Sequence, residues 1–327
     1  MTEPALLSHK IRGALAPCRL GAWPTPLEPA PGLAQALGLG ELCVKREDRS
    51  AARAGGNKVR GLEFLFAGVP SGTVFVTVGA TGSTHCLATA VHAPRIGCRA
   101  VLVQFPQPET RESRAVAEAS AAEAALVVRA RARATLPAAL WAGWRSARAL
   151  GRRRWIPGGG ADPRAVVGHF LAGLELAAQV ARPPDAIVLP LGTGGTAAGL
   201  VLAIIELGWP TRVIAVRVAP LLVANAWRVR ALARAAARLL RRHGVALGPL
   251  RRAPPLLVVN GAGRGYGHPT PAGARARALA ARYGLSLDPT YGAKALALLL
   301  GGVPGGVQRA VFWHTFALPR GAVEPGA

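Results

Sequence analysis

The sequence predicts an α/β fold, in which a mostly parallel sheet is covered by helices on both faces. Three observations support this prediction: short apolar runs recur along the chain, longer segments of helical composition follow them, and 327 residues suffice for about two domains. The strands are expected at residues 42–45, 74–78, 100–104, 187–190 and 213–218. The helices are expected at residues 58–66, 83–92, 196–207, 222–243 and 293–300. The Ala- and Arg-rich segment 111–150 should add helices and a strand at positions that its pattern does not fix.

A run of three glycines, residues 158–160, follows Pro157. Such a run breaks any helix and suits a crossover from one domain to another. We therefore expect the domain boundary there.

Composition excludes several classes of protein. No uninterrupted apolar run approaches the roughly 18 residues of a membrane span, and the first residues lack a basic region followed by an apolar stretch, so a cytoplasmic protein is expected. The four cysteines show no CxxC spacing, which argues against a zinc site and a disulfide framework. His85 and His92 could share one helix face, but two histidines make a weak metal site, and no metal is expected.

The chain carries a formal net charge of +24, and only four of its 40 basic residues are lysines. A basic surface attracts nucleic acid without specificity. The richest stretch, residues 227–242, places several arginines, among them Arg234 and Arg238, on one side of a helix. A solvated helix face explains this pattern, and no aromatic interleaving or zinc-finger spacing accompanies it. Specific nucleic-acid recognition is therefore not expected.

A lysine follows a glycine turn in the segment Gly55-Gly56-Asn57-Lys58. The turn delivers the Lys58 amine to the start of a predicted helix. There the partial positive charge of the helix end and removal from bulk water favour the neutral amine, which can attack an aldehyde. Because 36 of the 40 basic residues are arginines, a lysine at this position suggests that its amine takes part in a reaction. The turn alone fits an ordinary surface lysine equally well.

A second glycine loop, residues 192–195, lies between a predicted strand and a predicted helix. Its small residues let backbone N–H groups converge on a phosphate, and the hydroxyls of Thr193 and Thr196 can add hydrogen bonds. The loop lacks the Gly-Lys-Ser/Thr ending of a Walker motif. No acidic residue ends the next strand, which argues against a dinucleotide site.

Together these features resemble the D-cysteine desulfhydrase and 1-aminocyclopropane-1-carboxylate deaminase family of pyridoxal-phosphate enzymes, over most of the chain from Thr25 to Thr315. Residues 45–60 are similar to the family's lysine segment, and residues 78–85 are similar to its small-domain motif. Three further similar segments follow in the family's order, at residues 157–175, 263–267 and 288–294.

The resemblance implies a fold type II pyridoxal-phosphate enzyme of the tryptophan-synthase-like kind, with two open, twisted, mostly parallel sheets and helices on both faces. A large cofactor-binding domain would comprise residues 1–60 and 161–327, and a small domain residues 61–160. It also implies pyridoxal 5'-phosphate as the cofactor, a small amino acid as the substrate, and a homodimer.

By position, the resemblance implies that Lys58 holds the cofactor covalently and acts in catalysis. Ser83, Tyr266 and Tyr291 are implied to face the substrate and to take part in catalysis. Further contacts to the cofactor are implied for Asn57, Thr84, Gly192, Thr193, Gly194, Gly195, Thr196 and Thr315.

The sequence departs from the family at several cofactor contacts. Thr84 stands where the family carries an asparagine that bonds the cofactor's phenolic oxygen. Gly61 stands where a phosphate-contacting lysine is often found, leaving Arg60 or another arginine to compensate. Gly292 replaces a threonine or glutamate near the pyridine nitrogen, and Phe316 replaces a glycine. We expect altered reactivity rather than a different fold.

The expected activity is β-elimination from a small amino acid, in the manner of D-cysteine desulfhydrase, with release of pyruvate and ammonia. A cofactor ring whose nitrogen is not protonated supports elimination with little accumulation of carbanion charge. Gly292 has no carboxyl group that could keep that nitrogen protonated. Three alternatives stay open: a 1-aminocyclopropane-1-carboxylate deaminase, a family member that binds the cofactor with impaired catalysis, and a basic nucleic-acid binder.

Overall fold

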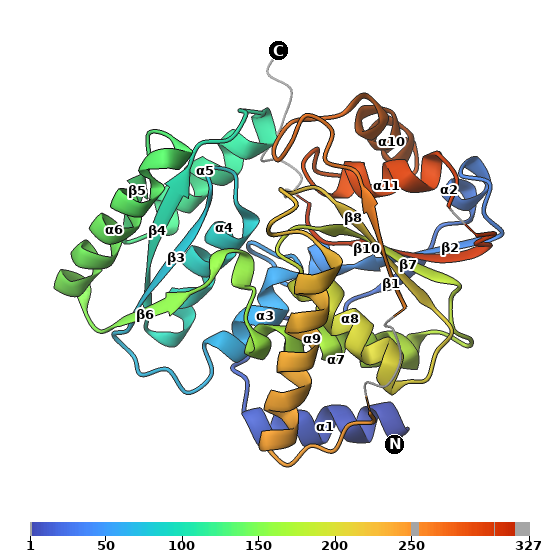
Figure 1. Cartoon of the computed structure of the whole chain (residues 1–327), viewed down its shortest axis with the longest axis horizontal. Helices are drawn as coiled ribbons and strands as arrows, with labels where there is room; N and C mark the ends of the chain where they lie inside the picture. The colour runs from blue at the N-terminus through green and yellow to red at the C-terminus, as the bar shows by residue number, and fades with distance from the viewer. Residues whose placement is uncertain (1, 250–254, 304, 318–327) are drawn as a thin grey trace.

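The computed structural model describes residues 2–249, 255–303 and 305–317. Their strands form two sheets (Figure 1). The larger sheet contains, in spatial order, β1 (Leu27–Pro29), β2 (Glu41–Arg46), β10 (Arg309–His314), β7 (Ala186–Leu191), β8 (Arg212–Arg217) and β9 (Leu256–Asn260). The smaller sheet contains, in spatial order, β5 (Leu126–Arg129), β4 (Arg99–Phe105), β3 (Val74–Ala80) and β6 (Arg153–Ile156). Only β1 and β2 pair antiparallel within the described ranges, so the predicted α/β fold is confirmed.

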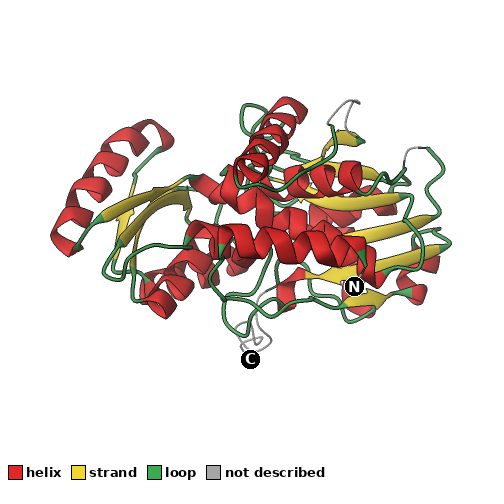
Figure 2. Cartoon of the chain, turned by 90° about the horizontal axis from the view of Figure 1, so that it is seen from below, coloured by secondary structure: helices red, strands yellow, loops and turns green. Residues whose placement is uncertain are grey.

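Helices cover both faces of the larger sheet, as Figure 2 shows. One face carries α1 (Glu3–Leu15), α7 (Pro163–Gln179), α8 (Gly195–Glu206) and α9 (Ala226–Arg242). The opposite face carries α2 (Pro31–Ala36), α10 (Pro271–Arg282) and α11 (Gly292–Leu300). The α8 segment is apolar nearly all round because it lies between the sheet and two further helices, so almost none of its surface meets water.

The smaller sheet is also covered on both faces. On one face lie α3 (Lys58–Leu65) and α4 (Thr84–His92), with α5 (Arg111–Glu123) packed against α4. On the other face lies α6 (Leu136–Leu150). Short 3-10 helices are η1 (Glu47–Arg49), η2 (Ala93–Ile96), η3 (Arg133–Thr135) and η4 (Gly158–Gly160).

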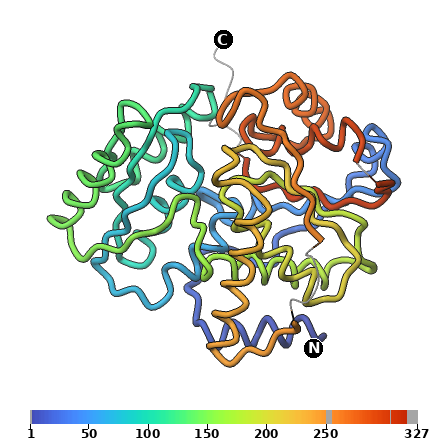
Figure 3. The backbone as a smooth tube through the Cα atoms, viewed as in Figure 1, coloured from blue at the N-terminus to red at the C-terminus, as the bar shows by residue number. Residues whose placement is uncertain are grey.

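Segments far apart in the sequence pair in the larger sheet, where the blue β2 and the red β10 lie side by side in Figure 3. Their register pairs Trp313 with Lys45. The residues just beyond β10 consequently reach the lysine turn, and the Asn57 N–H donates to the Thr315 carbonyl at 2.9 Å.

All five predicted strands and all five predicted helices are present, with ends shifted by one or two residues in most cases. The exception is α9, predicted from residue 222, which begins at Ala226 because Asn225 is extended and its side chain caps the helix by accepting the Arg228 N–H. Segment 111–150 does contain helices and a strand, as expected.

The glycine run at residues 158–160 connects β6 to α7, as a crossover between the sheets should. The residue 60 boundary falls inside α3, whose Phe64 joins the core of the larger sheet while Val59 and Leu62 join that of the smaller one. The domain limits therefore stay a prediction.

No helix of the described part is both long enough and apolar enough to cross a membrane.

Candidate active site

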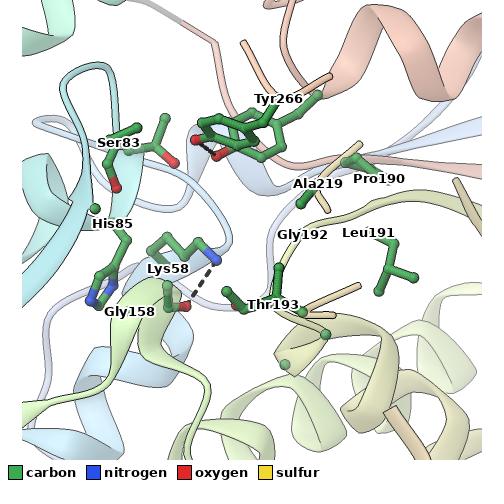
Figure 4. A pocket seen from close by; sticks show the side chains of 18 of the residues that line it. Lys58, Ser83, His85, Gly158, Pro190, Leu191, Gly192, Thr193, Ala219 and Tyr266 are labelled. Atoms are coloured by element: carbon green, nitrogen blue, oxygen red, sulfur yellow. Dashed lines mark hydrogen bonds between the residues drawn. The ribbon is translucent and has the colours of Figure 1, made fainter. Parts of the chain in front are cut away.

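A cavity of about 450 Å³ opens where the loops after β3, β7 and β8 face one another (Figure 4). These loops follow the carboxyl ends of parallel strands, the usual place for ligand sites in α/β folds. The cavity wall includes every predicted site residue: Asn57, Lys58, Ser83, Thr84, Gly192, Thr193, Gly194, Gly195, Thr196, Tyr266, Tyr291 and Thr315. The structure thus brings together residues that lie up to 258 positions apart in the chain, between Asn57 and Thr315.

Lys58 is the first residue of α3, and its side chain extends into the cavity (Figure 4). Its Nζ donates to the Gly159 carbonyl at 3.1 Å, with no carboxylate partner among the described residues. Burial lowers the pKa of Lys58 to about 8, because the surrounding protein solvates an ammonium less well than water does. About a tenth of the amine is therefore neutral at pH 7, far more than for an exposed lysine.

The turn before Lys58 is fixed by hydrogen bonds. Ser50 Oγ accepts the Gly56 N–H at 2.8 Å and donates to the Gly56 carbonyl at 3.0 Å. Asn57 Nδ2 donates to Thr196 Oγ1 at 2.8 Å, which ties the lysine turn directly to the second glycine loop. A side chain at Gly56 would meet the Thr315 carbonyl at 2.9 Å, so the close approach of the C-terminal segment requires glycine.

The second glycine loop ends at Gly194, whose φ of +95° turns the chain into α8. No side chain caps this helix. The first N–H groups of a helix lack intrahelical partners, and Gly195, Thr196 and Ala197 line the cavity. An uncapped helix start at a cavity wall suits an anion such as a phosphate.

Ser83 lies across the cavity from the glycine loop, at the start of α4 (Figure 4). It caps this helix by accepting the Cys86 N–H at 3.3 Å. The side chain is 6% exposed, and its hydroxyl can still donate. Thr84 follows as the first residue of α4 and also lines the cavity.

Tyr266 and Tyr291 also line the cavity and form a hydroxyl pair, with 2.5 Å between the two oxygens. Burial raises the pKa of Tyr266 to about 12 and raises the pKa of Tyr291 well above its usual value of 10. Both phenols therefore stay protonated at neutral pH. One hydroxyl of the pair donates to the other, which leaves one O–H free to donate toward a ligand.

Two buried charged groups hold the tyrosines. Lys294 Nζ donates to the Ala262 and Gly265 carbonyls at 2.9 and 3.1 Å, just before Tyr266. The Asp288 carboxylate accepts the Tyr291 N–H at 2.6 Å.

The sequence did not reveal several residues of the cavity wall. His85 donates to or accepts from Thr77 Oγ1 at 3.0 Å, and burial together with the Lys58 charge lowers its pKa to about 3, so it is neutral. Arg133 and Arg228 bring positive charge from η3 and α9. Arg228 lies within a predicted helix, but no signal in the sequence marks it as the arginine of that helix that faces the cavity.

Arg60 does not reach the cavity, although the sequence offered it as a substitute for a phosphate-contacting lysine. It is 2% exposed, with Nε 2.6 Å from Glu47 Oε2 and Nη2 2.9 Å from Glu175 Oε1. The two carboxylates hold its guanidinium in the protein core.

The cavity fits pyridoxal 5'-phosphate in its chemistry. It presents one amine of lowered pKa for an aldehyde, and an uncapped helix start for a phosphate. Its described wall contains no Asp or Glu side chain. Thr315 and Tyr291 offer only neutral hydroxyls.

Comparison with known proteins agrees with this chemistry. The family model described as pyridoxal-phosphate dependent enzyme matches residues 18–315. The chain is 36% identical to nocardicin C-9' epimerase of Nocardia uniformis subsp. tsuyamanensis, over 93% of each protein. It is 31% identical to D-cysteine desulfhydrase of Klebsiella pneumoniae subsp. pneumoniae, over 86% of each.

Among solved structures, an ACC deaminase homologue superposes with a TM-score of 0.79 at 27% identity, over 94% of each chain. The resemblance stated from the sequence is thus confirmed. The chain belongs to the family of pyridoxal-phosphate dependent enzymes, with the fold type II architecture and the cofactor of that family.

Proposed function

We propose that this enzyme is a lyase that acts on a small amino acid by β-elimination and releases pyruvate and ammonia, in the manner of D-cysteine desulfhydrase. The observation that carries the proposal is a cavity wall with two protonated tyrosines and, among its described residues, no carboxylate. Such a wall has phenols that can protonate a leaving group. It has no carboxylate that could pair with a protonated nitrogen of the cofactor ring.

Each predicted residue has a role in this proposal. Lys58 would hold the cofactor, and the helix start at Gly195 and Thr196 would bind its phosphate, with Gly192, Thr193 and Gly194 shaping the loop. Asn57 and Thr84 would face the cofactor ring, and Thr315 would meet the ring nitrogen with a neutral hydroxyl. Bound pyridoxal 5'-phosphate withdraws electrons from the α-carbon of an attached amino acid.

The protein residues then move the protons. The Lys58 amine would remove the α-proton of the bound substrate, and burial, which lowers its pKa to about 8 in this cavity, favours the neutral amine that this role needs. Tyr266 and Tyr291 share one short hydrogen bond, so a proton lost by one phenol to the leaving group can be replaced through the other. Ser83 would position the substrate carboxylate with its hydroxyl.

Opening of a cyclopropane ring is less well supported than elimination. It needs a stronger electron sink than thiol departure does, and a neutral hydroxyl at the ring nitrogen provides a weaker sink than an acid. The deaminase therefore remains an alternative, together with a family member whose catalysis is impaired.

Epimerisation at the α-carbon is a second candidate, because the 36% identical relative is named an epimerase. Inversion needs one group to remove the α-proton and another to return a proton to the opposite face. Lys58 could serve as the first and Ser83 or the tyrosine pair as the second, since they extend from different elements into one cavity (Figure 4).

The test is a product screen with purified enzyme loaded with pyridoxal 5'-phosphate. We expect pyruvate and ammonia from D-cysteine or β-chloro-D-alanine, and a strong loss with Ser83→Ala. Formation of 2-oxobutanoate from 1-aminocyclopropane-1-carboxylate without any pyruvate would favour the deaminase. Solvent deuterium at the α-carbon with inverted configuration and no pyruvate would favour the epimerase.

A homodimer and a cytoplasmic location remain predictions.

A further inference from the structure

Arg228, in the first turn of α9, contacts the loop that precedes α8. Its Nε donates to the Thr193 carbonyl at 3.1 Å, and the residue lines the cavity. Its own backbone N–H donates to Asn225 Oδ1 at 2.8 Å, which caps α9. The residue is therefore anchored at two points, through its backbone in the cap of α9 and through its side chain on the glycine loop.

The charge of Arg228 has no counterion in the described part of the chain. Its guanidinium bonds only the Thr193 carbonyl there, which leaves the two terminal nitrogens free to donate. A guanidinium is always charged and presents paired donors in a plane, the geometry that phosphate oxygens accept best. The free donors of this guanidinium, beside the uncapped start of α8, suit an anion.

The other cations of the region cannot take this place. Lys58 is needed for the aldehyde end of the cofactor, and Arg60 is held in the core by two carboxylates. Arg133 lies on the wall formed by the smaller sheet, near the Phe105 ring at 5.8 Å. The structure also explains the absent lysine at Gly61, because a Cβ there would lie 2.9 Å from the Ala165 Cβ of α7.

We propose that Arg228 is the residue that pairs a positive charge with the phosphate group of the cofactor. Helix α9 thereby supplies the cation that the lysine-bearing helix α3 has no room for. This inference rests on the proposed cofactor placement, with the phosphate at the start of α8. It adds a phosphate contact from outside the segments in which the sequence placed the site.

The test compares the variants Arg228→Met and Arg228→Lys with the wild-type protein. Arg234→Met is the matched control, because Arg234 is exposed on the same helix and does not line the cavity. The dissociation constants of pyridoxal 5'-phosphate and of pyridoxal, which lacks the phosphate, are measured by fluorescence and equilibrium dialysis. No turnover is needed. Circular dichroism checks that each variant is folded.

We expect Arg228→Met to weaken binding of pyridoxal 5'-phosphate by about 10- to 100-fold, the range for a charge-assisted hydrogen bond pair. Binding of pyridoxal should change less than about threefold, Arg228→Lys should recover part of the loss, and Arg234→Met should match wild type.

An unchanged constant for pyridoxal 5'-phosphate in folded Arg228→Met would overturn the inference while leaving the proposed function intact. An equal loss of affinity for pyridoxal 5'-phosphate and for pyridoxal would also overturn it, since Arg228 would then hold the loop in shape without contacting the phosphate. Failure of the wild-type protein to bind pyridoxal 5'-phosphate would overturn the proposed placement as well.

Discussion

The side chain of Thr84 lines the cavity and ends one bond short of the reach of an asparagine, the residue that the family resemblance implies at this position. Thr84→Asn should tighten the binding of pyridoxal 5'-phosphate about tenfold, because an amide can complete a bond to the phenolic oxygen that the hydroxyl reaches poorly. A spectrophotometric titration measures the constant. Thr84→Val, of the same shape without the hydroxyl, should be no tighter than wild type. Weaker binding by the asparagine variant would mean that another residue has taken this contact.

At the scale of the element, α3 is held by a buried ion network. Arg60 bonds both Glu47 and Glu175, and Lys45 Nζ lies 2.5 Å from Glu175 Oε1. Burial alone would raise the pKa of Glu175, but the charges of Arg60 and Lys45 lower it overall. Two residues before Arg60, the same helix begins with Lys58, so the network fixes the direction in which the lysine enters the cavity.

Glu175→Gln should therefore destabilise the protein by about 2 to 3 kcal/mol, since it leaves buried cations without a full counterion. Urea denaturation measures the free energy of unfolding. Glu118→Gln on α5 is the control, because Glu118 is exposed and its loss should cost less than about 0.5 kcal/mol. A loss no larger than that of the control would show that the network does not stabilise α3.

Lys294 anchors the loop that carries Tyr266. Lys294→Met removes both bonds from Nζ to the backbone before Tyr266. The tyrosine should then be less well placed, with kcat for elimination lowered about tenfold and the dissociation constant of the cofactor unchanged within about twofold. Loss of the cofactor to the same degree as loss of rate would contradict the idea that Lys294 acts through Tyr266.

The sequence could predict the lysine turn and the glycine loop because both are local: a few adjacent residues set the backbone and point it at a ligand. It could not find Arg133 or Arg228, since which arginines of a helix turn inward depends on how that helix packs. The role of Arg60 was obscured for the same reason, because its carboxylate partner Glu175 lies 115 residues away. The start of α9 was missed because Asn225 outweighed the helical composition of residues 222–224.

For the whole molecule, four buried histidines predict sensitivity to mild acid. Burial lowers the pKa of His85 to about 3, and of His92 and His314 to about 4, and holds that of His169 well below 6.5. A group whose pKa is lower in the folded state contributes stability above its unfolded pKa, and loses it as the pH falls toward the folded value.

The free energy of unfolding should consequently decline as the pH falls below about 6.5, by up to about 1.4 kcal/mol per pH unit for each histidine. Urea denaturation between about pH 7.5 and about pH 5 tests this prediction. A flat profile across that range would mean that the histidines are not held neutral by the fold.

We expect Lys58 to carry pyridoxal 5'-phosphate in this cavity, and the chain provides its own controls because its other lysines are only Lys10, Lys45 and Lys294. Borohydride reduction of the loaded protein, followed by mass spectrometry of its peptides, identifies the lysine that has joined the aldehyde. We predict the added mass on the peptide of Lys58 alone, and its loss together with the visible absorbance band in a folded Lys58→Ala variant. Added mass on the peptide of Lys45 or Lys294, or a visible band that persists without Lys58, would contradict the account.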